Sequence, residues 1–301
     1  MSFEEKEMIS EGDSTDWQLA KEEVKAALHF KHPPRPPLAN SLWHNEETRR
    51  VLGEEFGRIL QEFPDDVVHA GMGWPYWDAP EDKPDFRWAF GNKKKPENTA
   101  IDNMPIIEDW SELKQFLDEM PDPHTPGMEN GIKEISRTHP DRYVLVGFGH
   151  FFHQRLCYLR GVQNLLFDFL DAPYNLIKIM EALMKYYEVW LERAAAAGAD
   201  GVWAGDDFGT QRSLFMSPKL FRSLYKPFYK QLVDTAHHLE LDLWLHTCGN
   251  VTEIMDDFIE IGIDALHPIQ VGTMDDTMIV SKYGGKITFW VGMDVQTSYP
   301  I

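Results

Sequence analysis

The sequence predicts an α/β fold, a (β/α)8 barrel, on three observations. From about residue 143 onward, short apolar runs that suit buried strands alternate with stretches at helical spacing, which is typical of a parallel sheet with right-handed crossovers. Polar side chains follow the strand ends in this half of the chain, where barrel enzymes carry their chemistry. An open doubly wound sheet is disfavoured because the sequence has no glycine-rich phosphate-binding loop.

Composition limits the class of protein and of partner. The chain has 301 residues, and its 29 Lys and Arg against 49 Asp and Glu give a net charge of −20. This charge argues against nucleic-acid and anionic-membrane partners, which need a basic face. Two cysteines, Cys157 and Cys248, are too few for a disulfide framework and indicate a reducing cytoplasm. Because no signal peptide or bilayer-spanning run is recognisable, we expect a soluble cytoplasmic protein.

The N-terminal part divides into an arm and the start of the barrel domain. Residues 1–44 are polar and then proline-rich, which predicts an extended arm. The barrel domain is assigned to 45–301. It begins with an amphipathic helix over 45–63, whose apolar stripe is Val51, Leu52, Phe56, Ile59 and Leu60, and a short strand over 66–70 follows. Residues 78–140 lack clear periodicity and are interpreted as a long irregular insertion, a lid or a binding loop.

The C-terminal part reads as regular strand–helix units. A helix that begins at Ser217-Pro218 is expected to kink at Pro227. The predicted strands are 66–70, 143–148, 201–204, 241–245, 264–266 and 287–291, and the predicted helices between them lie near 171–198, 217–232, 251–261 and 274–283. A closed barrel needs eight strands. Either two strands lie unrecognised in the irregular region, or the chain ends before the last units of the barrel.

Candidate site residues gather after successive strands. Each of them alone is explained by a helix cap or a satisfied buried polar group, but four groups in a row favour a functional site. Along a strand neighbouring side chains point to opposite faces, so we expect Asp207 to handle substrate or protons and Asp206 to stand behind it. The predicted catalytic residues are Asp206, Asp207, His267 and Asp294, and the predicted substrate-binding residues are Trp74, Gln211, Gln270 and Gln296.

The stretch LDLWLHTCGNV at 241–251 indicates a metal. His246 and Cys248 stand at i and i+2, so in extended backbone their side chains leave on the same side. Imidazole and thiolate are preferred zinc ligands, but structural zinc takes four protein ligands and catalytic zinc three. The alternative is a strand end with a chance histidine and a buried thiol.

Several segments together resemble the uroporphyrinogen decarboxylase superfamily, most closely its methyltransferase-like branch. They are RLCYLRGVQNLLFDFLDAP (155–173), GDDFGTQ (205–211), MSPKLFRSLYKPFYKQL (216–232), LHTCGNV (245–251), IDALHPIQ (263–270) and YGGKITFWVGMDVQ (283–296). The resemblance implies a (β/α)8 barrel with its site at the carboxyl-end mouth.

Two chemistries occur in families of this type. The porphyrinogen decarboxylases bind their acid through an N-terminal arginine motif, which has no match here; the nearest basic residue is Arg35. The corrinoid-linked methyltransferases hold zinc with a His-x-Cys pair, matched by His246 and Cys248, and with a downstream cysteine. No cysteine follows Cys248. This fits a chain that ends early; in a complete chain the further ligand would come from Asp206, Asp207, Glu253, His267 or Cys157.

The resemblance therefore implies a zinc-dependent methyltransferase that moves a methyl group between a small methylated compound or thiol and a corrinoid protein. The expected cofactors are zinc and a corrinoid carried by the partner. A carboxy-lyase acting on a porphyrinogen is the first alternative. A non-catalytic barrel that binds a ligand or a partner is the second.

Overall fold

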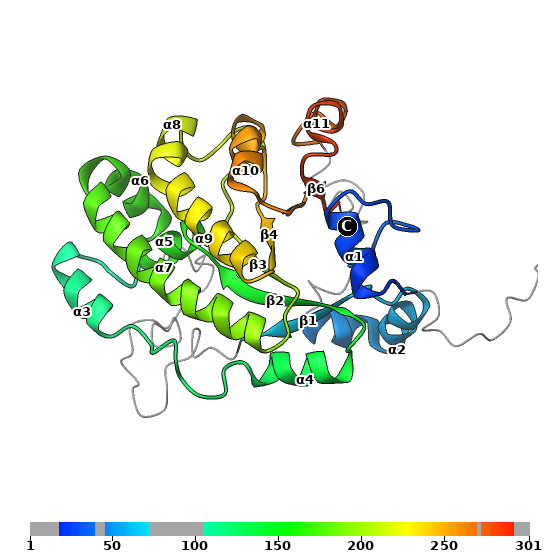
Figure 1. Ribbon diagram of the computed structural model, residues 1–301. Coiled ribbons are helices and arrows are strands. Elements are labelled where there is room, and N and C mark those ends of the chain that lie inside the picture. The colour runs from blue at the N-terminus through cyan, green and yellow to red at the C-terminus, as the bar shows by residue number, and fades with distance from the viewer. Residues whose placement is uncertain (1–17, 40–45, 73–104, 270–271, 292–301) are drawn as a thin grey trace, which may run out of the picture.

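The computed structural model describes residues 18–39, 46–72, 105–269 and 272–291. Its centre is one parallel sheet in which each strand pairs with the next along the chain, in the order β1 to β6. The strands are β1 (Val67–Gly71), β2 (Tyr143–His150), β3 (Gly201–Gly205), β4 (Asp242–His246), β5 (Ala265–His267) and β6 (Thr288–Phe289). All six predicted strands are confirmed, and with the helices between them they form a partial (β/α)8 barrel (Figure 1).

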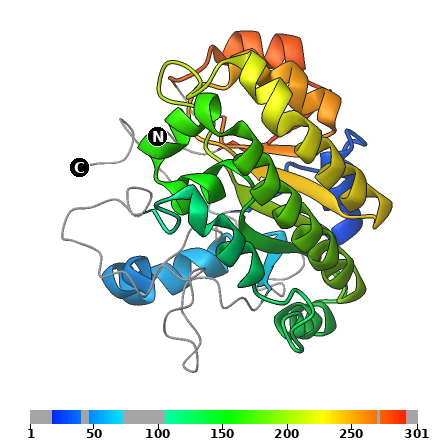
Figure 2. The same cartoon turned by 90° about the vertical axis from the view of Figure 1, so that its left-hand side faces the viewer.

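Helices cover the outer face of the sheet. They are α5 (His153–Arg160), α6 (Val162–Asp171), α7 (Pro173–Ala196), α8 (Pro218–Leu220), α9 (Lys226–His238), α10 (Met255–Ile261), preceded by the 3-10 turn η6 (Thr252–Ile254), and α11 (Asp276–Tyr283). Helices α7 and α9 run alongside each other (Figures 1 and 2). The helix predicted near 171–198 is α7, and its apolar residues at helical spacing, including Leu176, Leu183 and Trp190, are buried against the core.

The kink expected at Pro227 is a widened helical turn. Between α8 and α9 lies a π-helical turn, η5 (Phe221–Tyr225), and Pro227 stands in the first turn of α9. Proline has no backbone N–H and its ring collides with the carbonyl four residues earlier, so a regular α-helix is interrupted here. The π-turn accommodates the interruption.

The N-terminal segment differs from the expected extended arm. It contains helix α1 (Lys21–Leu28), in which Val24 and Leu28 are buried. These two side chains pack with Tyr143, Trp244 and others in a core cluster separate from the main core. The prediction missed this helix because apolar side chains four residues apart are too few for a visible stripe. Figure 1 shows α1 beside the amino ends of the strands, away from their carboxyl ends. The assigned limits of the arm and of the barrel domain stay predictions.

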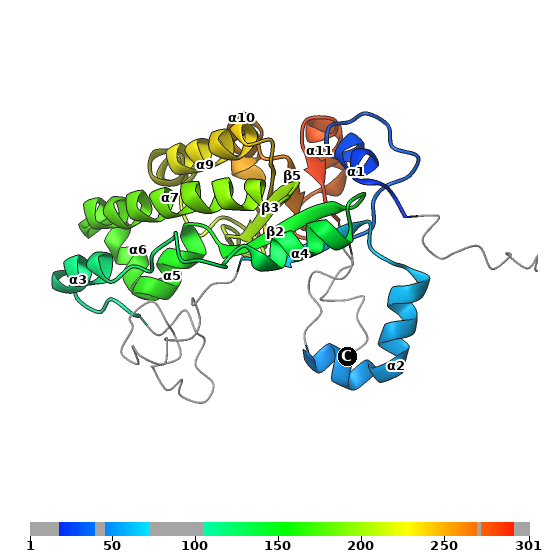
Figure 3. The ribbon, with the colours of Figure 1, turned by 60° about the horizontal axis from the view of Figure 1, so that its bottom comes forward.

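Helix α2 (Glu46–Glu62) exists as predicted, but most of its apolar stripe is not buried. Only Phe56 of the five stripe residues is buried, while Val51, Leu52 and Ile59 are exposed. Gly53 has φ 52° and ψ −128°, which interrupts the helix and breaks the alignment of the stripe. Figure 3 shows α2 projecting from the rest of the fold.

The region predicted as an irregular insertion contains regular structure in its described part. It holds η4 (Trp110–Glu112), α3 (Leu113–Asp118) and α4 (Asn130–Thr138). The indole of Trp110 donates to Asp168 at 2.9 Å, and Arg160 stacks 4.2 Å over the same ring, so this segment is anchored on α5 and α6. Residues 78–104 lie outside the described part of the chain.

Candidate functional site

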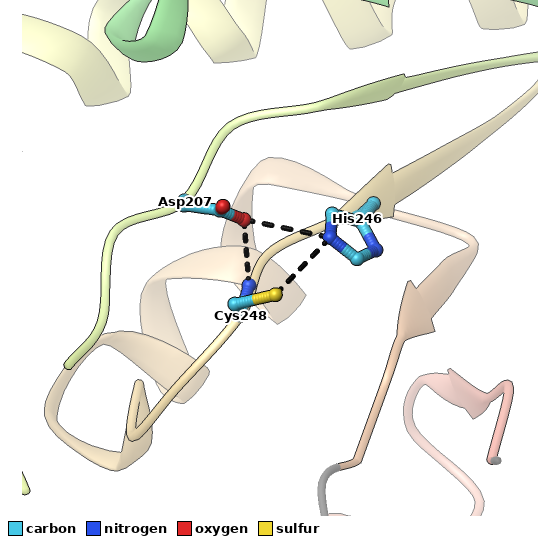
Figure 4. A group of neighbouring side chains, drawn as sticks. All are labelled: Asp207, His246 and Cys248. Atoms are coloured by element: carbon cyan, nitrogen blue, oxygen red, sulfur yellow. Dashed lines mark hydrogen bonds and ion pairs between the residues drawn. The ribbon is translucent and has the colours of Figure 1, made fainter. Parts of the chain in front are cut away.

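Three side chains meet where β3 and β4 end (Figure 4). The Sγ atom of Cys248 lies 3.3 Å from Nε2 of His246, and the same Nε2 lies 3.5 Å from Oδ1 of Asp207. Oδ1 of Asp207 also accepts the backbone N–H of Cys248 at 2.8 Å. The strand register explains the meeting, because Gly205 pairs with His246 and so the residues that follow both strand ends are neighbours.

The loops that carry these residues cross at two glycines. Gly249 has φ +82°, a left-handed backbone conformation that glycine adopts without strain. A Cβ atom at Gly209 would lie 2.8 Å from the carbonyl oxygen of Cys248 and 2.7 Å from the backbone nitrogen of Asn250, so only glycine fits the crossing. The backbone N–H of Asn250 donates to the carbonyl oxygen of Thr210 at 2.7 Å, and this hydrogen bond joins the two loops.

His267, from the end of β5, stands behind His246. Strand register pairs the two residues, and their Nδ1 atoms lie 2.7 Å apart. Burial and the neighbouring His246 lower the pKa of His267 to about 3, so its ring is neutral at pH 7. Two neutral rings in this contact need one donor and one acceptor. When His246 donates its Nδ1–H to Nδ1 of His267, its own Nε2 carries a lone pair. Nε2 is the atom that faces Cys248 and Asp207.

The site has the ligand types and spacing of a metal centre. The ligand atoms of Asp207, His246 and Cys248 all lie within 4.8 Å of one another. Tetrahedral zinc with bonds of about 2.0–2.3 Å keeps its ligand atoms about 3.3–3.8 Å apart, and the spacings of 3.3 Å from Nε2 of His246 to Sγ of Cys248 and 3.5 Å from Nε2 to Oδ1 of Asp207 match this. These residues therefore fit zinc.

The thiol of Cys248 is protonated when no cation is near. Burial and the adjacent Asp207 raise its pKa to about 12. A bound divalent cation reverses this effect and deprotonates a coordinating thiol. Zinc binding at neutral pH is then coupled to the release of a proton.

Asp206 faces the other way, as strand alternation predicts. Its carboxylate is fully buried and accepts the backbone N–H groups of Phe152, His153 and Gln154 at 2.7–2.9 Å, together with the hydroxyl of Tyr229. Burial raises the pKa of Asp206 to about 6. Asp206 thus secures the start of α5, and Asp207 alone of the pair lies beside His246.

Of the remaining predicted site residues, only Gln211 lies in the described part of the chain, and it does not belong to this group. The side chain of Gln211 is exposed on the loop after β3. The predicted residues Trp74, Gln270, Asp294 and Gln296 lie outside the described residues.

A cavity of about 290 Å³ adjoins the group and adds residues that sequence reasoning missed. Besides Asp207 and His246, it is lined by His150, Gln154 and Trp203. His150 ends β2 and its Nδ1 bonds to the carbonyl of Gly205 at 3.0 Å. The rule used for the other strands, polar residues at carboxyl ends, would have found His150 if the predicted strand had extended two residues beyond Phe148.

Comparisons with known proteins agree with this description. Residues 90–281, more than half of the chain, match the model of the family described as uroporphyrinogen decarboxylase (URO-D). No sequence among the curated proteins matches the chain. The described residues contain no helix that combines the length and apolar character needed to cross a membrane.

Among solved structures, a methyltransferase from Methanosarcina mazei superposes with a TM-score of 0.60 at 16% identity, covering 93% of this chain and 84% of that one. A variant of NCR from Zymomonas mobilis reaches a TM-score of 0.33 at 16% identity, covering 57% of this chain and 56% of that one. The first of these likenesses shows the fold.

Proposed function

Because the chain belongs to the uroporphyrinogen decarboxylase (URO-D) family, we propose that it is a zinc-dependent methyltransferase acting between a small methylated compound or thiol and a corrinoid protein. The observation that supports this is the convergence of Asp207, His246 and Cys248 at the carboxyl ends of the strands. The Methanosarcina mazei protein of similar fold is a methyltransferase, which agrees with the proposal.

In this proposal His246 and Cys248 hold the zinc, and Asp207, whose Oδ1 lies 3.5 Å from Nε2 of His246, is a third ligand. Bound zinc would polarise the heteroatom of a methyl donor or lower the pKa of a thiol. His267 orients the ring of His246, and Asp206 positions α5, which carries Gln154 into the cavity. If a thiol accepted the methyl group, a new S–C bond would form, the thiol proton would go to solvent, and the bond between the methyl carbon and the corrinoid would break with its electron pair left on the corrinoid.

Charge favours methyl transfer over the decarboxylase alternative. Among the described residues, no lysine or arginine lines the cavity at His246, and the carboxylate of Asp207 does. A porphyrinogen with several carboxylates would need cations there. The volume of about 290 Å³ lies at the lower end for ligand sites, which suits a small substrate. We also propose that the protein is located in the reducing cytoplasm, because two cysteines are too few for a disulfide framework.

Metal analysis of the purified protein tests the proposal. We expect about one zinc per chain, and its loss in the double variant His246→Ala, Cys248→Ala. Cys157→Ala, which removes the other thiol, should keep its zinc. A protein without bound metal, or a double variant with unchanged zinc, would contradict the proposal.

Release of carbon dioxide from uroporphyrinogen by the purified protein would favour the decarboxylase instead. Bound zinc without transfer of a methyl group to any corrinoid would favour the non-catalytic barrel.

A further inference from the structure

A second cavity, of about 200 Å³, adjoins the one at His246. Asp207 and Gln154 line both cavities, so these two side chains form the boundary between them. The second cavity is enclosed by α5, α6 and the loop after β3, and the metal ligands His246 and Cys248 do not line it. Nothing in the proposed role of the three zinc ligands accounts for this space.

The lining of this cavity is mostly apolar. Val162, Leu165, Leu166 and Phe215 contribute hydrocarbon surface. Leu166 is 45% exposed and Phe215 is 44% exposed, so both stand at an opening through which a ligand can enter. An apolar cavity of about 150 Å³ in another protein stays dry and binds benzene. A cavity of about 200 Å³ therefore accommodates one six-membered ring with a small substituent.

The polar groups in this cavity select a neutral ligand. His153 and Cys157 lie 3.8 Å apart, between Nε2 and Sγ, and both are buried. Burial lowers the pKa of His153 to about 4, so its ring carries no charge at pH 7. Among the described residues that line the cavity there is no lysine or arginine, and Asp207 is acidic. A carboxylate or sulfonate on the ring would find no cation there.

We propose that this second cavity binds the hydrocarbon body of a neutral, single-ring methyl ether or thioether. The heteroatom and its methyl group would then pass the Asp207–Gln154 boundary into the cavity at His246. This inference rests on the proposed methyl transfer, because it assigns the substrate class to that same site. It makes the body of the substrate, and not only its methyl group, a determinant of specificity.

Binding of methoxybenzene to the purified protein, followed by isothermal titration calorimetry or ligand-observed NMR, tests the inference. We expect a Kd on the order of 1 mM for a ligand of this size. Leu166→Trp, which fills the opening, should weaken binding at least about tenfold. Leu170→Trp is the matched control: Leu170 is on the same helix, is 83% exposed and does not line the cavity, so binding should stay within about twofold.

A second measurement uses the unmodified protein and needs no variant. 4-Methoxybenzoate has the same ring with an added anion and should bind at least about tenfold more weakly than methoxybenzene. Equal binding of the two compounds, no binding of methoxybenzene, or equal loss in both tryptophan variants would overturn the inference.

The double variant His246→Ala, Cys248→Ala separates this inference from the proposed function. Because neither residue lines the second cavity, toluene, which has the ring but no heteroatom to place beside His246, should bind the variant with the wild-type affinity although zinc is lost. Ring binding in a protein that never holds zinc supports the cavity and counts against the methyltransferase. Zinc binding without ring binding counts against the second cavity as a ring site and supports the methyltransferase.

Discussion

At the scale of single residues, the site depends on histidines that are kept neutral by burial. His153 is the clearest of them, since it is 4% exposed and its Nδ1 bonds to the hydroxyl of Tyr225 at 3.0 Å. Its pKa of about 4 lies below the value of about 6.5 expected in the unfolded chain. A depressed pKa in the folded state means that the unfolded state binds the proton more tightly. The stability from this group is complete above pH 6.5 and is lost as the pH falls towards 4.

We predict that His153→Gln flattens the acid side of the stability profile. Glutamine keeps a hydrogen-bonding group near Tyr225 but takes up no proton. The wild-type free energy of unfolding should fall by up to about 3 kcal/mol more than that of the variant between pH 6.5 and 4. Urea unfolding at a series of pH values measures this difference. His139→Gln, at an exposed histidine, is the control and should run parallel to the wild type. Parallel curves for His153→Gln would contradict the prediction.

At the scale of elements, the site is assembled by two loops that cross without room for a side chain. Cys248 is fixed by its N–H bond to Asp207 and by the glycine that follows it. Because one loop carries Asp207 and the other carries Cys248, a displacement of either loop changes the position of one ligand relative to His246, which ends β4. The crossing at Gly209 and Gly249 is thus the structural requirement for the proposed zinc centre.

We predict that Gly249→Ala weakens zinc binding by about 10- to 100-fold, the range seen when groups that orient ligands are altered. The added Cβ would collide with the backbone of Gly209 and Thr210. Competition with a chelator measures the affinity. Gly285→Ala provides the control, because Gly285 has φ +77° but no atom within 4 Å of an added Cβ. It carries the same kind of backbone strain and should leave zinc affinity unchanged. Equal losses in the two variants would show that strain, and not the close approach, is responsible.

At the scale of the whole molecule, the N-terminal segment closes the amino end of the barrel through charge as well as burial. Four aspartates stand at the beginnings of the strands, and each pairs with a basic side chain, three of them with residues of segment 18–39. The pairs are Arg35–Asp66, Lys21–Asp200, His29–Asp242 and His237–Asp264, at 2.7–3.0 Å. Asp66 is fully buried and also accepts the backbone N–H groups of Leu19 and Leu38.

We predict that Arg35→Ala lowers the free energy of unfolding by about 2–3 kcal/mol, because it leaves the buried carboxylate of Asp66 without its cation. This is below the range for fully buried pairs, since the Arg35 side chain is 29% exposed. Arg58→Ala is the matched control. Arg58 pairs with Glu55 at the surface, where its side chain is 71% exposed, and its loss should cost less than about 1 kcal/mol. Urea unfolding compares the two, and similar losses would refute the role of the closure.

The amino-acid sequence alone determined the order of strands, the helices on the outer face and the pairing of His246 with Cys248. These features follow from spacing over a few residues, because the helical period of about 3.6 and the strand period of 2 fix which side chains share one face. Only the tertiary structure decided that Asp207 completes the group, that His267 supports His246, and that α1 packs at the opposite end of the barrel. Each of these depends on register between segments at least 21 residues apart, as the contact of His246 with His267 illustrates. Register between distant segments is selected by the packing of the whole core, and no local pattern encodes it.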